Sequence, residues 1–519
     1  MTTDAASLAW PEGNIAHLLA ARATENPGAG FVHADTRGPW TYADVAAAAR
    51  LLGARLRERG VGGGDRVVVR IGNDERFPVA AYAVWSIGAV AVPMHPRIPV
   101  TDARAIRKLL DPLAVVGDAD DPLAVETITP FLAVDRFQAG RVKPVELDVA
   151  EMGADGPALV LLTSGSTGTP KGVPLTHGNA WANLRSTASA FSSRTDRFPV
   201  APADRSPNLV ANPVSHTAGI LRVLLASYVG RRIVLVGKFN VPLVLDLLDQ
   251  HGIDNLTINP AMIRMLLEET PEGRDLAGVK YVSSGTAPLP PALRERFEQR
   301  FGVPILQAYG QTEAFGGIAV ESVRDVLAGK RRPRSVGKPL RGVEVRIQGP
   351  QGPVACGSEG EIQVRSGSMS HRYTGGGDAA TVTDDGWLRT GDLGRLDEEG
   401  YLYVTGRLKN LIIAGGFNVY PEELEAALEA HGAVREAIVL GIPDERLGEV
   451  PVGLVELLDD TVGSDTLLAH AAGRLAPYKR PRALYLVESL PRVANGKPDR
   501  TRCRDLVDRL ISSETVEAG

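Results

Sequence analysis

Residues 163–172 read Thr-Ser-Gly-Ser-Thr-Gly-Thr-Pro-Lys-Gly, and this stretch decides the fold of the chain. Its glycines let backbone N–H groups approach phosphate oxygens closely, and its hydroxyls add donors that rotate to suit them. A Walker A loop would end in Gly-Lys-Ser/Thr and open a helix directly. Here Pro170 precedes Lys171, and Val173-Pro174-Leu175 is typical of extended chain. With the apolar run Ala158–Leu162 before it, the stretch predicts a polyphosphate loop within a strand hairpin, in preference to an ordinary polar surface loop.

Four further motifs follow in order along the chain. They are Tyr309-Gly310-Gln311-Thr312-Glu313, Thr390-Gly391-Asp392, Gly406-Arg407-Leu408-Lys409 and Leu490-Pro491-Arg492-Val493-Ala494-Asn495-Gly496-Lys497. Any one of them alone is more often a solvated turn. Together the five motifs resemble the signature of the AMP-forming adenylating enzymes, which include acyl- and aryl-CoA ligases, peptide-synthetase adenylation domains and firefly luciferase. The pattern is most similar to that of the acyl-CoA synthetases.

The resemblance implies a site for ATP and Mg²⁺. In this interpretation Glu313 holds the cation, Tyr309 packs on adenine, and Asp392 accepts from the ribose hydroxyls with support from Arg407. A carboxylate suits a hard cation that bridges phosphates, and an aromatic face suits a purine. The expected ATP-binding residues are Thr163, Ser164, Gly165, Ser166, Thr167, Gly168, Lys171, Gly285, Thr286, Ala287, Pro288, Ala308, Tyr309, Gly310, Gln311, Thr312, Asp392 and Arg407.

The resemblance also makes Lys497 the catalytic lysine, which reaches from a small C-terminal domain into the active site. A cation beside the α-phosphate and the attacking carboxylate stabilises charge that two anions would otherwise oppose. The catalytic residues expected are Lys497, Glu313, Thr167 and His216.

A hinge is implied at residues 407–410, with Lys409 at the hinge position. Such a hinge would let the small domain bring Lys497 in for adenylation and withdraw it for thioester formation. Gly415 and Gly416 are then expected to line a tunnel for phosphopantetheine. The chain departs from the family pattern at Asn410, where Asp is frequent, and at Phe417, where Glu is commoner.

The segment Asn212–Gly219 resembles the family region whose His or aromatic residue gates the acyl pocket. No Asp lies between Asn208 and Leu235, which disfavours an amino-acid substrate. Ala308, Ala314, Phe315 and Gly316-Gly317 predict an apolar pocket with small residues, which favours a medium acyl or an aryl acid as substrate. Arg222 interrupts the apolar helix expected at 218–228; we expect it to point to solvent or to pair elsewhere, with recognition of a second carboxylate as the less favoured role. The expected pocket residues are His216, Thr217, Gly285, Gly310, Ala314, Phe315 and Gly316.

The predicted fold class is α/β, with a large multi-lobed N-terminal domain of layered βα sheets plus a strand-rich lobe, and a small mobile α+β C-terminal domain. Two stretches alternate helical and strand patterns, namely residues 1 to about 150 and 157 to about 345. Strands dominate from 342 to 403. The domain boundaries expected are 1–406 for the adenylate-forming domain, 407–410 for the hinge and 411–519 for the domain that carries Lys497.

Composition agrees with a soluble enzyme of several lobes. The chain has 519 residues, which is more than a single hydrophobic core supports. Its formal net charge of -5 does not indicate the basic surface that nucleic-acid binding requires. Its two cysteines, Cys356 and Cys503, fit neither a disulfide framework nor a zinc site. The most apolar stretch, 78–94, favours a buried helix and strand over a membrane span. We expect a cytoplasmic monomer or homodimer.

The reaction expected is ATP-dependent activation of a carboxylic acid to an acyl adenylate with release of pyrophosphate, followed by transfer to the thiol of coenzyme A. An alternative acceptor is the phosphopantetheinyl thiol of an acyl carrier protein, or another nucleophile. A nucleotide-binding protein without catalysis is disfavoured because Lys171, Glu313, Asp392, Arg407 and Lys497 are all present.

Overall fold

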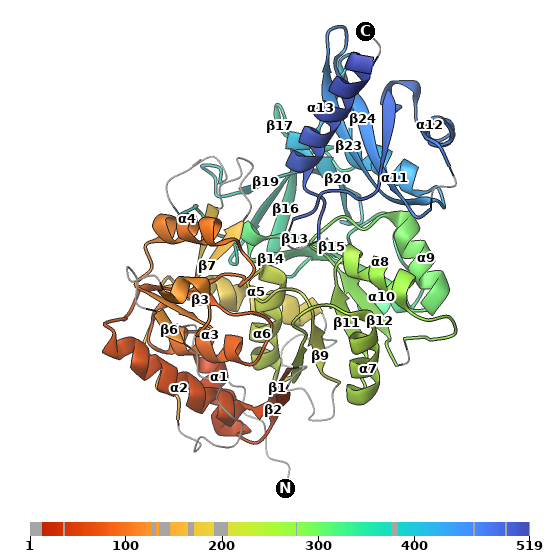
Figure 1. The fold of residues 1–519 in the computed structure, drawn as a ribbon. Helices are drawn as coiled ribbons and strands as arrows, with labels where there is room; N and C mark the ends of the chain where they lie inside the picture. Colours follow the sequence, from red (N-terminus) through yellow and green to blue (C-terminus); the bar gives the residue numbers. More distant parts are fainter. Residues whose placement is uncertain are drawn as a thin grey trace.

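The structure is a computed structural model that describes residues 13–34, 37–125, 131–133, 146–163, 171–190, 206–276, 278–374, 382–459, 462–493 and 496–517. Within these residues the chain forms a large body of three sheets and a smaller C-terminal body with a sheet of its own. In Figure 1 the smaller body, drawn in blue, lies above the large one. The predicted fold class is confirmed.

The first sheet has six strands and carries the hairpin predicted around the phosphate loop. β7 and β8 run antiparallel, and Thr163 pairs with Lys171 where the hairpin opens. The apolar stretch at 78–94 forms the buried helix and strand that its composition predicts. In sheet order the strands are β6 (Phe131–Ala133), β5 (Ala114–Gly117), β3 (Arg66–Arg70), β4 (Val90–Pro93), β7 (Pro157–Thr163) and β8 (Lys171–Thr176). Its helices are α1 (His17–Glu25), α2 (Tyr42–Glu58), α3 (Arg76–Ser86) and α4 (Val100–Leu110).

The second sheet has nine strands, most of them parallel, which is the arrangement that alternating strands and helices favour. In sheet order the strands are β15 (Lys338–Pro339), β14 (Gly316–Val320), β13 (Ile305–Gln311), β12 (Tyr281–Ser284), β11 (Asn255–Ile258), β9 (Asn208–Val210), β10 (Ile233–Leu235), β1 (Gly30–Ala34) and β2 (Arg37–Thr41). Its helices are α5 (His177–Ala190), α6 (Thr217–Val229), α7 (Val241–His251), α8 (Pro260–Glu269), α9 (Pro291–Phe301) and α10 (Val323–Leu327).

The lobe limits expected from the sequence need correction. β1 belongs to the second sheet, where it pairs in parallel with β10, about two hundred residues away. Conversely, β7 and β8 complete the first sheet, because β4 pairs with β7. Periodicity identifies a strand but does not identify its distant partner. Lobe limits set by the turn residues between elements therefore miss this exchange of strands.

The third sheet is the expected strand-rich lobe, and it leads into the small domain. Its strands are β17 (Gly352–Pro353), β16 (Val343–Gly349), β18 (Gly360–Ser366), β19 (Leu388–Leu396) and β20 (Leu402–Arg407). A short helical turn at Leu408–Asn410 separates β20 from the last sheet. The small domain contains β22 (Phe417–Val419), β21 (Ile412–Ala414), β24 (Gly448–Leu457), β23 (Val434–Asp444), β25 (Ala483–Val487), α11 (Pro421–Glu429), α12 (Ser464–Ala472) and α13 (Arg500–Glu517).

Candidate active site

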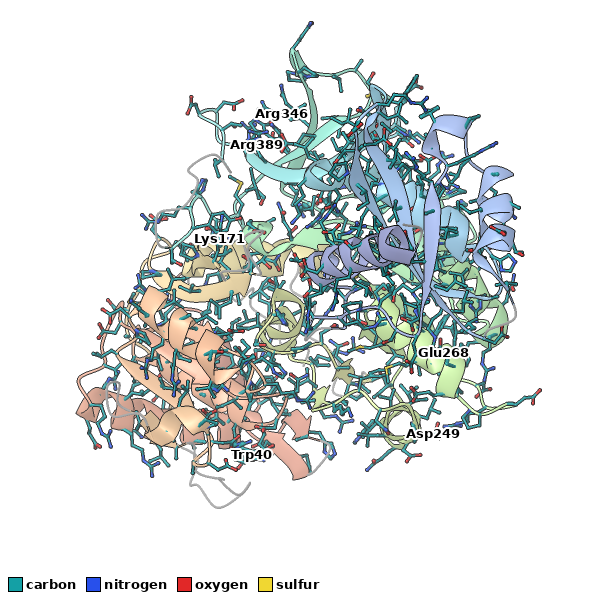
Figure 2. The ribbon with its side chains drawn as sticks, turned by 45° about the horizontal axis from the view of Figure 1, so that its top comes forward. Trp40, Lys171, Asp249, Glu268, Arg346 and Arg389 are labelled. Carbon is teal, nitrogen blue, oxygen red and sulfur yellow. The ribbon has the colours of Figure 1, made fainter. Side chains whose placement is uncertain are left out.

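A cleft of about 930 Å³ opens where the three sheets of the large body meet the small domain. β7 and β8 contribute Thr163 and Lys171 to it, and the turn before the small domain contributes Lys409. Lys497, near the end of the chain, also lines it. In Figure 2 Lys171 lies where the first lobe meets the strands that carry Arg389. Residues separated by more than three hundred positions are thus brought to one site.

The second nucleotide motif lies at the end of β13. There β13 and β14 approach so closely that a Cβ on Gly310 would collide with the carbonyl oxygen of Gly316. Phe315 takes a left-handed conformation with φ of 50°, which turns the chain back between the two strands. This tight reversal leaves Gln311, Thr312 and Glu313 in the cleft wall.

Glu313, the residue predicted to hold magnesium, is oriented by Tyr373. The Tyr373 hydroxyl donates to Glu313 Oε1 over 2.7 Å, and Lys171 Nζ lies 5.1 Å from the centre of the same ring. Tyr373 is held there because Thr374 N donates to Gly172 O over 2.8 Å. A single carboxylate is compatible with Mg²⁺, which binds through one or two carboxylates plus substrate phosphates. Sequence reasoning missed Tyr373 because it belongs to none of the recognised motifs.

Asp392 connects two of the other predicted ATP residues. Its Oδ2 accepts a 2.7 Å hydrogen bond from the Tyr309 hydroxyl, and its Oδ1 lies 2.8 Å from Arg407 Nε. Burial and the neighbouring Asp392 hold the pKa of Tyr309 well above its usual value, so Tyr309 stays a donor. Asp392 is buried and does not itself line the cleft, whereas its partners Tyr309 and Arg407 do. Each of its carboxylate oxygens retains a second lone-pair position as an acceptor.

Lys497 reaches the cleft from the small domain. Its Nζ donates to the carbonyl oxygen of Thr286. Burial and the charge of Arg407 lower the pKa of Lys497 to about 8. A lysine whose charge is this poorly solvated is stabilised by an incoming anion.

His216 and the helix that follows it form the wall opposite Lys497. His216 is the N-cap residue of α6, and Thr217 Oγ1 donates to Thr312 Oγ1 over 3.0 Å, which joins the helix to the nucleotide motif. Although His216 is open to the cleft, desolvation together with His95 and Lys497 lowers its pKa to about 4. His216 is therefore neutral at pH 7. Arg222, expected to point to solvent or to pair elsewhere, instead lines the cleft.

Two buried polar atoms in the cleft wall lack a partner among the described residues. They are Gln311 Nε2 and Ser284 Oγ. Buried donors are ordinarily satisfied, so unpartnered ones at a cleft indicate groups that a ligand completes. Together with Lys171, Arg407 and Lys497, they fit a polyanionic, polar ligand such as ATP.

Several predicted residues lie elsewhere. Ser164, Gly165, Ser166, Thr167 and Gly168 fall outside the described residues. Ala287 and Pro288 follow Thr286 but do not line the cleft. Ala314 and Phe315 are buried in hydrophobic clusters, because the left-handed turn directs the Phe315 ring into the core. Gly415 and Gly416 form the exposed turn between β21 and β22, away from the cleft wall.

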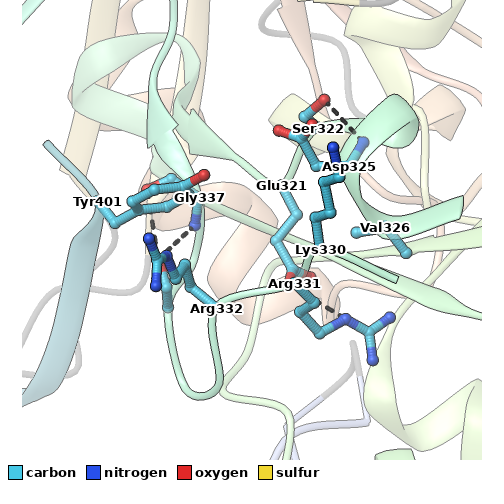
Figure 3. A pocket seen from close by; sticks show the side chains of 10 residues that line it. Glu321, Ser322, Asp325, Val326, Lys330, Arg331, Arg332, Gly337 and Tyr401 are labelled. Atoms are coloured by element: carbon cyan, nitrogen blue, oxygen red, sulfur yellow. Dashed lines mark hydrogen bonds and ion pairs between the residues drawn. The ribbon is translucent and has the colours of Figure 1, made fainter. Parts of the chain in front are cut away.

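A second hollow lies beside β14 and β20, and Figure 3 shows its charged lining. Its volume is about 10 Å³, which holds no more than a water molecule. Arg331 pairs with Glu298 over 2.9 Å, and Arg332 pairs with Glu399. These paired charges indicate a structural crevice between strands.

Comparison with known proteins agrees with the fold and the cleft. Residues 19–374 match the family of AMP-binding enzymes, and residues 423–497 match the AMP-binding enzyme C-terminal domain. The chain belongs to the AMP-binding enzyme family. This confirms the predicted family and the predicted class of AMP-forming acid–thiol ligase.

The similar proteins are CoA ligases. A 2-succinylbenzoate–CoA ligase of Bacillus velezensis is 34% identical over 90% of this chain and 93% of its own length. A long-chain-fatty-acid–CoA ligase of Mycobacterium tuberculosis is 30% identical over 95% of this chain and 98% of its own. The o-succinylbenzoate CoA synthetase of Bacillus subtilis, solved with its acyl-adenylate intermediate, superposes with a TM-score of 0.81 at 29% identity, over 93% of this chain and 96% of that one.

Proposed function

We propose that this chain is an acid–CoA ligase that works through an acyl adenylate. A carboxylate oxygen of the acid attacks the α-phosphorus of ATP, the bond to the bridging oxygen of the β-phosphate breaks, and pyrophosphate leaves. The thiolate of coenzyme A then attacks the acyl carbon, and AMP leaves. The observation that carries the proposal is the meeting of Lys171, Glu313 and Lys497 at one cleft in a chain of this family.

The roles follow from position and charge. Gln311, Asp392 and Arg407 would hold the nucleotide, and Glu313 would hold Mg²⁺ in the orientation set by Tyr373. Lys497 would place its positive charge between the reacting carboxylate and the α-phosphate. No side chain becomes covalently attached, so positioning and electrostatics supply the catalysis.

Residues 407–410 would serve as the hinge between domains 1–406 and 411–519. The Leu408–Asn410 turn supports this, because the chain there passes from the third sheet to the small domain. Gly415 and Gly416 would reach the cleft only after the small domain rotates, when they would line the pantetheine tunnel. No described helix is long and apolar enough to cross a membrane. The proposed location is the cytoplasm, where ATP and CoA are available, and the proposed state is a monomer or homodimer.

The test is pyrophosphate release with a panel of fatty, aryl and dicarboxylic acids, each with and without CoA. Sustained release that needs CoA, accompanied by AMP and an acyl-CoA product, supports the proposal. Pyrophosphate could instead exchange into ATP with acid alone, while no acyl-CoA forms when CoA is added. That result would indicate that the acceptor of the second step is a carrier-protein thiol. Absence of pyrophosphate release and of exchange with every acid would overturn the proposal.

A further inference from the structure

The cleft contains a cation that the reaction does not use. Arg222 lies on α6, where Ala218, Leu221, Arg222 and Leu225 all line the cleft. These positions are three and four residues apart, so they form one stripe of the helix. The other three side chains of the stripe are apolar. Arg222 therefore places a single charge in an apolar wall.

The sheet opposite this stripe supplies hydroxyls. Tyr281, the first residue of β12, is an electrostatic neighbour of Arg222, which identifies the face of the sheet that the Arg222 side chain approaches. Ser283 lies two residues after Tyr281 on the same strand, and Thr257 pairs with Ser283 in parallel register, so both hydroxyl residues share that face. Thr257 and Ser283 also line the cleft. Arg222 and these two hydroxyl residues therefore line the same cleft, Arg222 from α6 and the hydroxyls from the sheet face that it approaches.

Among the described residues, no carboxylate pairs with Arg222. Its electrostatic neighbours are Tyr281 and Arg231, and Arg231 is itself paired with Asp254 over 3.2 Å. The carboxylates that line the cleft are engaged elsewhere, Glu313 by Tyr373 and Glu361 by Arg389. Burial and the neighbouring Arg231 lower the pKa of Arg222, because no carboxylate of the described part of the chain compensates its charge. An arginine in a partly buried wall is ordinarily paired.

The position along the helix separates this charge from the chemistry. Thr217, at the start of α6, is bonded to Thr312 of the nucleotide motif. Arg222 lies five residues further along, or about 7.5 Å at the helical rise of about 1.5 Å per residue. An acid whose reacting carboxyl faces Lys497 would therefore extend along the stripe, with its far end toward Arg222.

We propose that Arg222 binds a second carboxylate at the far end of the substrate, and that this ligase activates dicarboxylic acids. The inference rests on the proposed function and names its substrate class. A guanidinium binds a carboxylate through two parallel N–H donors, and the Thr257 and Ser283 hydroxyls complete the site. Arg222 is a specificity-determining residue for the first half-reaction.

The test compares each dicarboxylic acid with its monomethyl ester, which keeps the chain length and removes the second charge. Unbranched acids of four to ten carbons and benzene dicarboxylic acids form the panel, with pyrophosphate–ATP exchange as the readout. In the wild-type protein kcat/KM for the best diacid should exceed that for its monoester on the order of a hundredfold. Arg222→Met should remove most of this preference, and Arg222→Lys should keep part of it. Arg50→Met, which removes an exposed arginine of α2 outside the cleft lining, should keep the wild-type ratio.

The outcomes separate this inference from the proposed function. Exchange that is equally efficient with monoesters and diacids in the wild-type protein would overturn the role of Arg222 and leave the ligase standing. Absence of exchange with every acid would overturn the proposed function. In that case calorimetric titration of a diacid into the ATP-loaded protein decides the inference, because binding that is lost in Arg222→Met supports the site and absence of binding overturns it.

Discussion

At the scale of single residues, the orientation of Glu313 depends on a hydroxyl that no motif contains. Tyr373→Phe removes the 2.7 Å hydrogen bond to Glu313 but keeps the ring under Lys171. We expect kcat for adenylation to fall roughly tenfold, with a higher Mg²⁺ requirement, since hydrogen bonds to charged groups are the stronger ones. Magnesium titrations of the exchange rate measure this.

Tyr403→Phe is the matched control, because it also removes a tyrosine hydroxyl bonded to an acid, Asp397, away from the cleft. If both variants behave like the wild type, Tyr373 does not position the magnesium ligand.

Lys497 offers a second prediction at this scale. Its pKa of about 8 in the protein without nucleotide leaves it half charged near pH 8. The triphosphate stabilises the charged form and raises the pKa, so ATP binding should take up protons between pH 8 and 9 and much fewer near pH 6.5, where the lysine is already charged. Calorimetry in buffers of different ionisation enthalpy measures this uptake. Lys497→Met should lack the alkaline component, and an unchanged proton count in that variant would contradict the assignment.

At the scale of elements, the reversal between β13 and β14 depends on the absence of a side chain. Gly310→Ala places a methyl group against the Gly316 carbonyl, so the strands must separate where Gln311 and Glu313 are positioned. We expect a loss of about 2 kcal/mol in the free energy of unfolding and of most ATP binding. Gly432→Ala is the control, because a methyl group there meets nothing within 4 Å. Equal stability of the two variants by urea unfolding would contradict the packing described.

Helix α11 carries a carboxylate whose titration affects stability. Burial raises the pKa of Glu429 from 4.5 to about 8, although Arg264 and the amide of Ala437 act in the opposite direction. The folded state thus retains a proton that the unfolded state has released above pH 4.5. The stability from this group is present below that value and is lost as pH rises to about 8.

Glu429→Gln removes this dependence while keeping an acceptor for Ala437 N. The variant should unfold like the wild type at pH 5 and should be more stable at pH 9. Chemical unfolding at the two pH values measures the difference, with the exposed Glu398→Gln as control. A stability gain of the same size at both pH values would show that Glu429 does not titrate in this range.

Much of the architecture could be predicted at this scale. The hairpin around the phosphate loop and the buried helix and strand within 78–94 agree with the structure, because apolar periodicity and turn residues report local structure. The exchange of β1 and β7 between sheets could not be predicted, because pairing between strands far apart in the sequence leaves no local pattern. Tyr373 and Arg222 were missed or misplaced for the same reason, since only the fold brings them to the cleft.

At the scale of the whole molecule, the small domain is docked with Lys497 in the cleft. Arg264 Nη2 lies 3.6 Å from Glu436 Oε1, and Arg435 Nη2 lies 3.2 Å from Glu268 Oε2. These two ion pairs join the large body to the small domain. Figure 2 labels Glu268 on the side of the large body that faces the small domain. The Arg435–Glu268 pair is partly exposed to solvent and contributes little to stability, which suits a contact that would open in the proposed hinge motion.

The most direct test of this account separates the two half-reactions in Lys497→Ala. Pyrophosphate–ATP exchange should fall by a factor on the order of 10² to 10³, because a charge positioned for the transition state is lost. The rate of thioester formation from a supplied acyl adenylate and CoA should stay within a few-fold of the wild-type rate. In the control variant Lys280→Ala, which removes an exposed lysine, the rates of both half-reactions should stay within a few-fold of wild type. Exchange that survives in Lys497→Ala, or an equal loss in both half-reactions, would contradict the role given to Lys497.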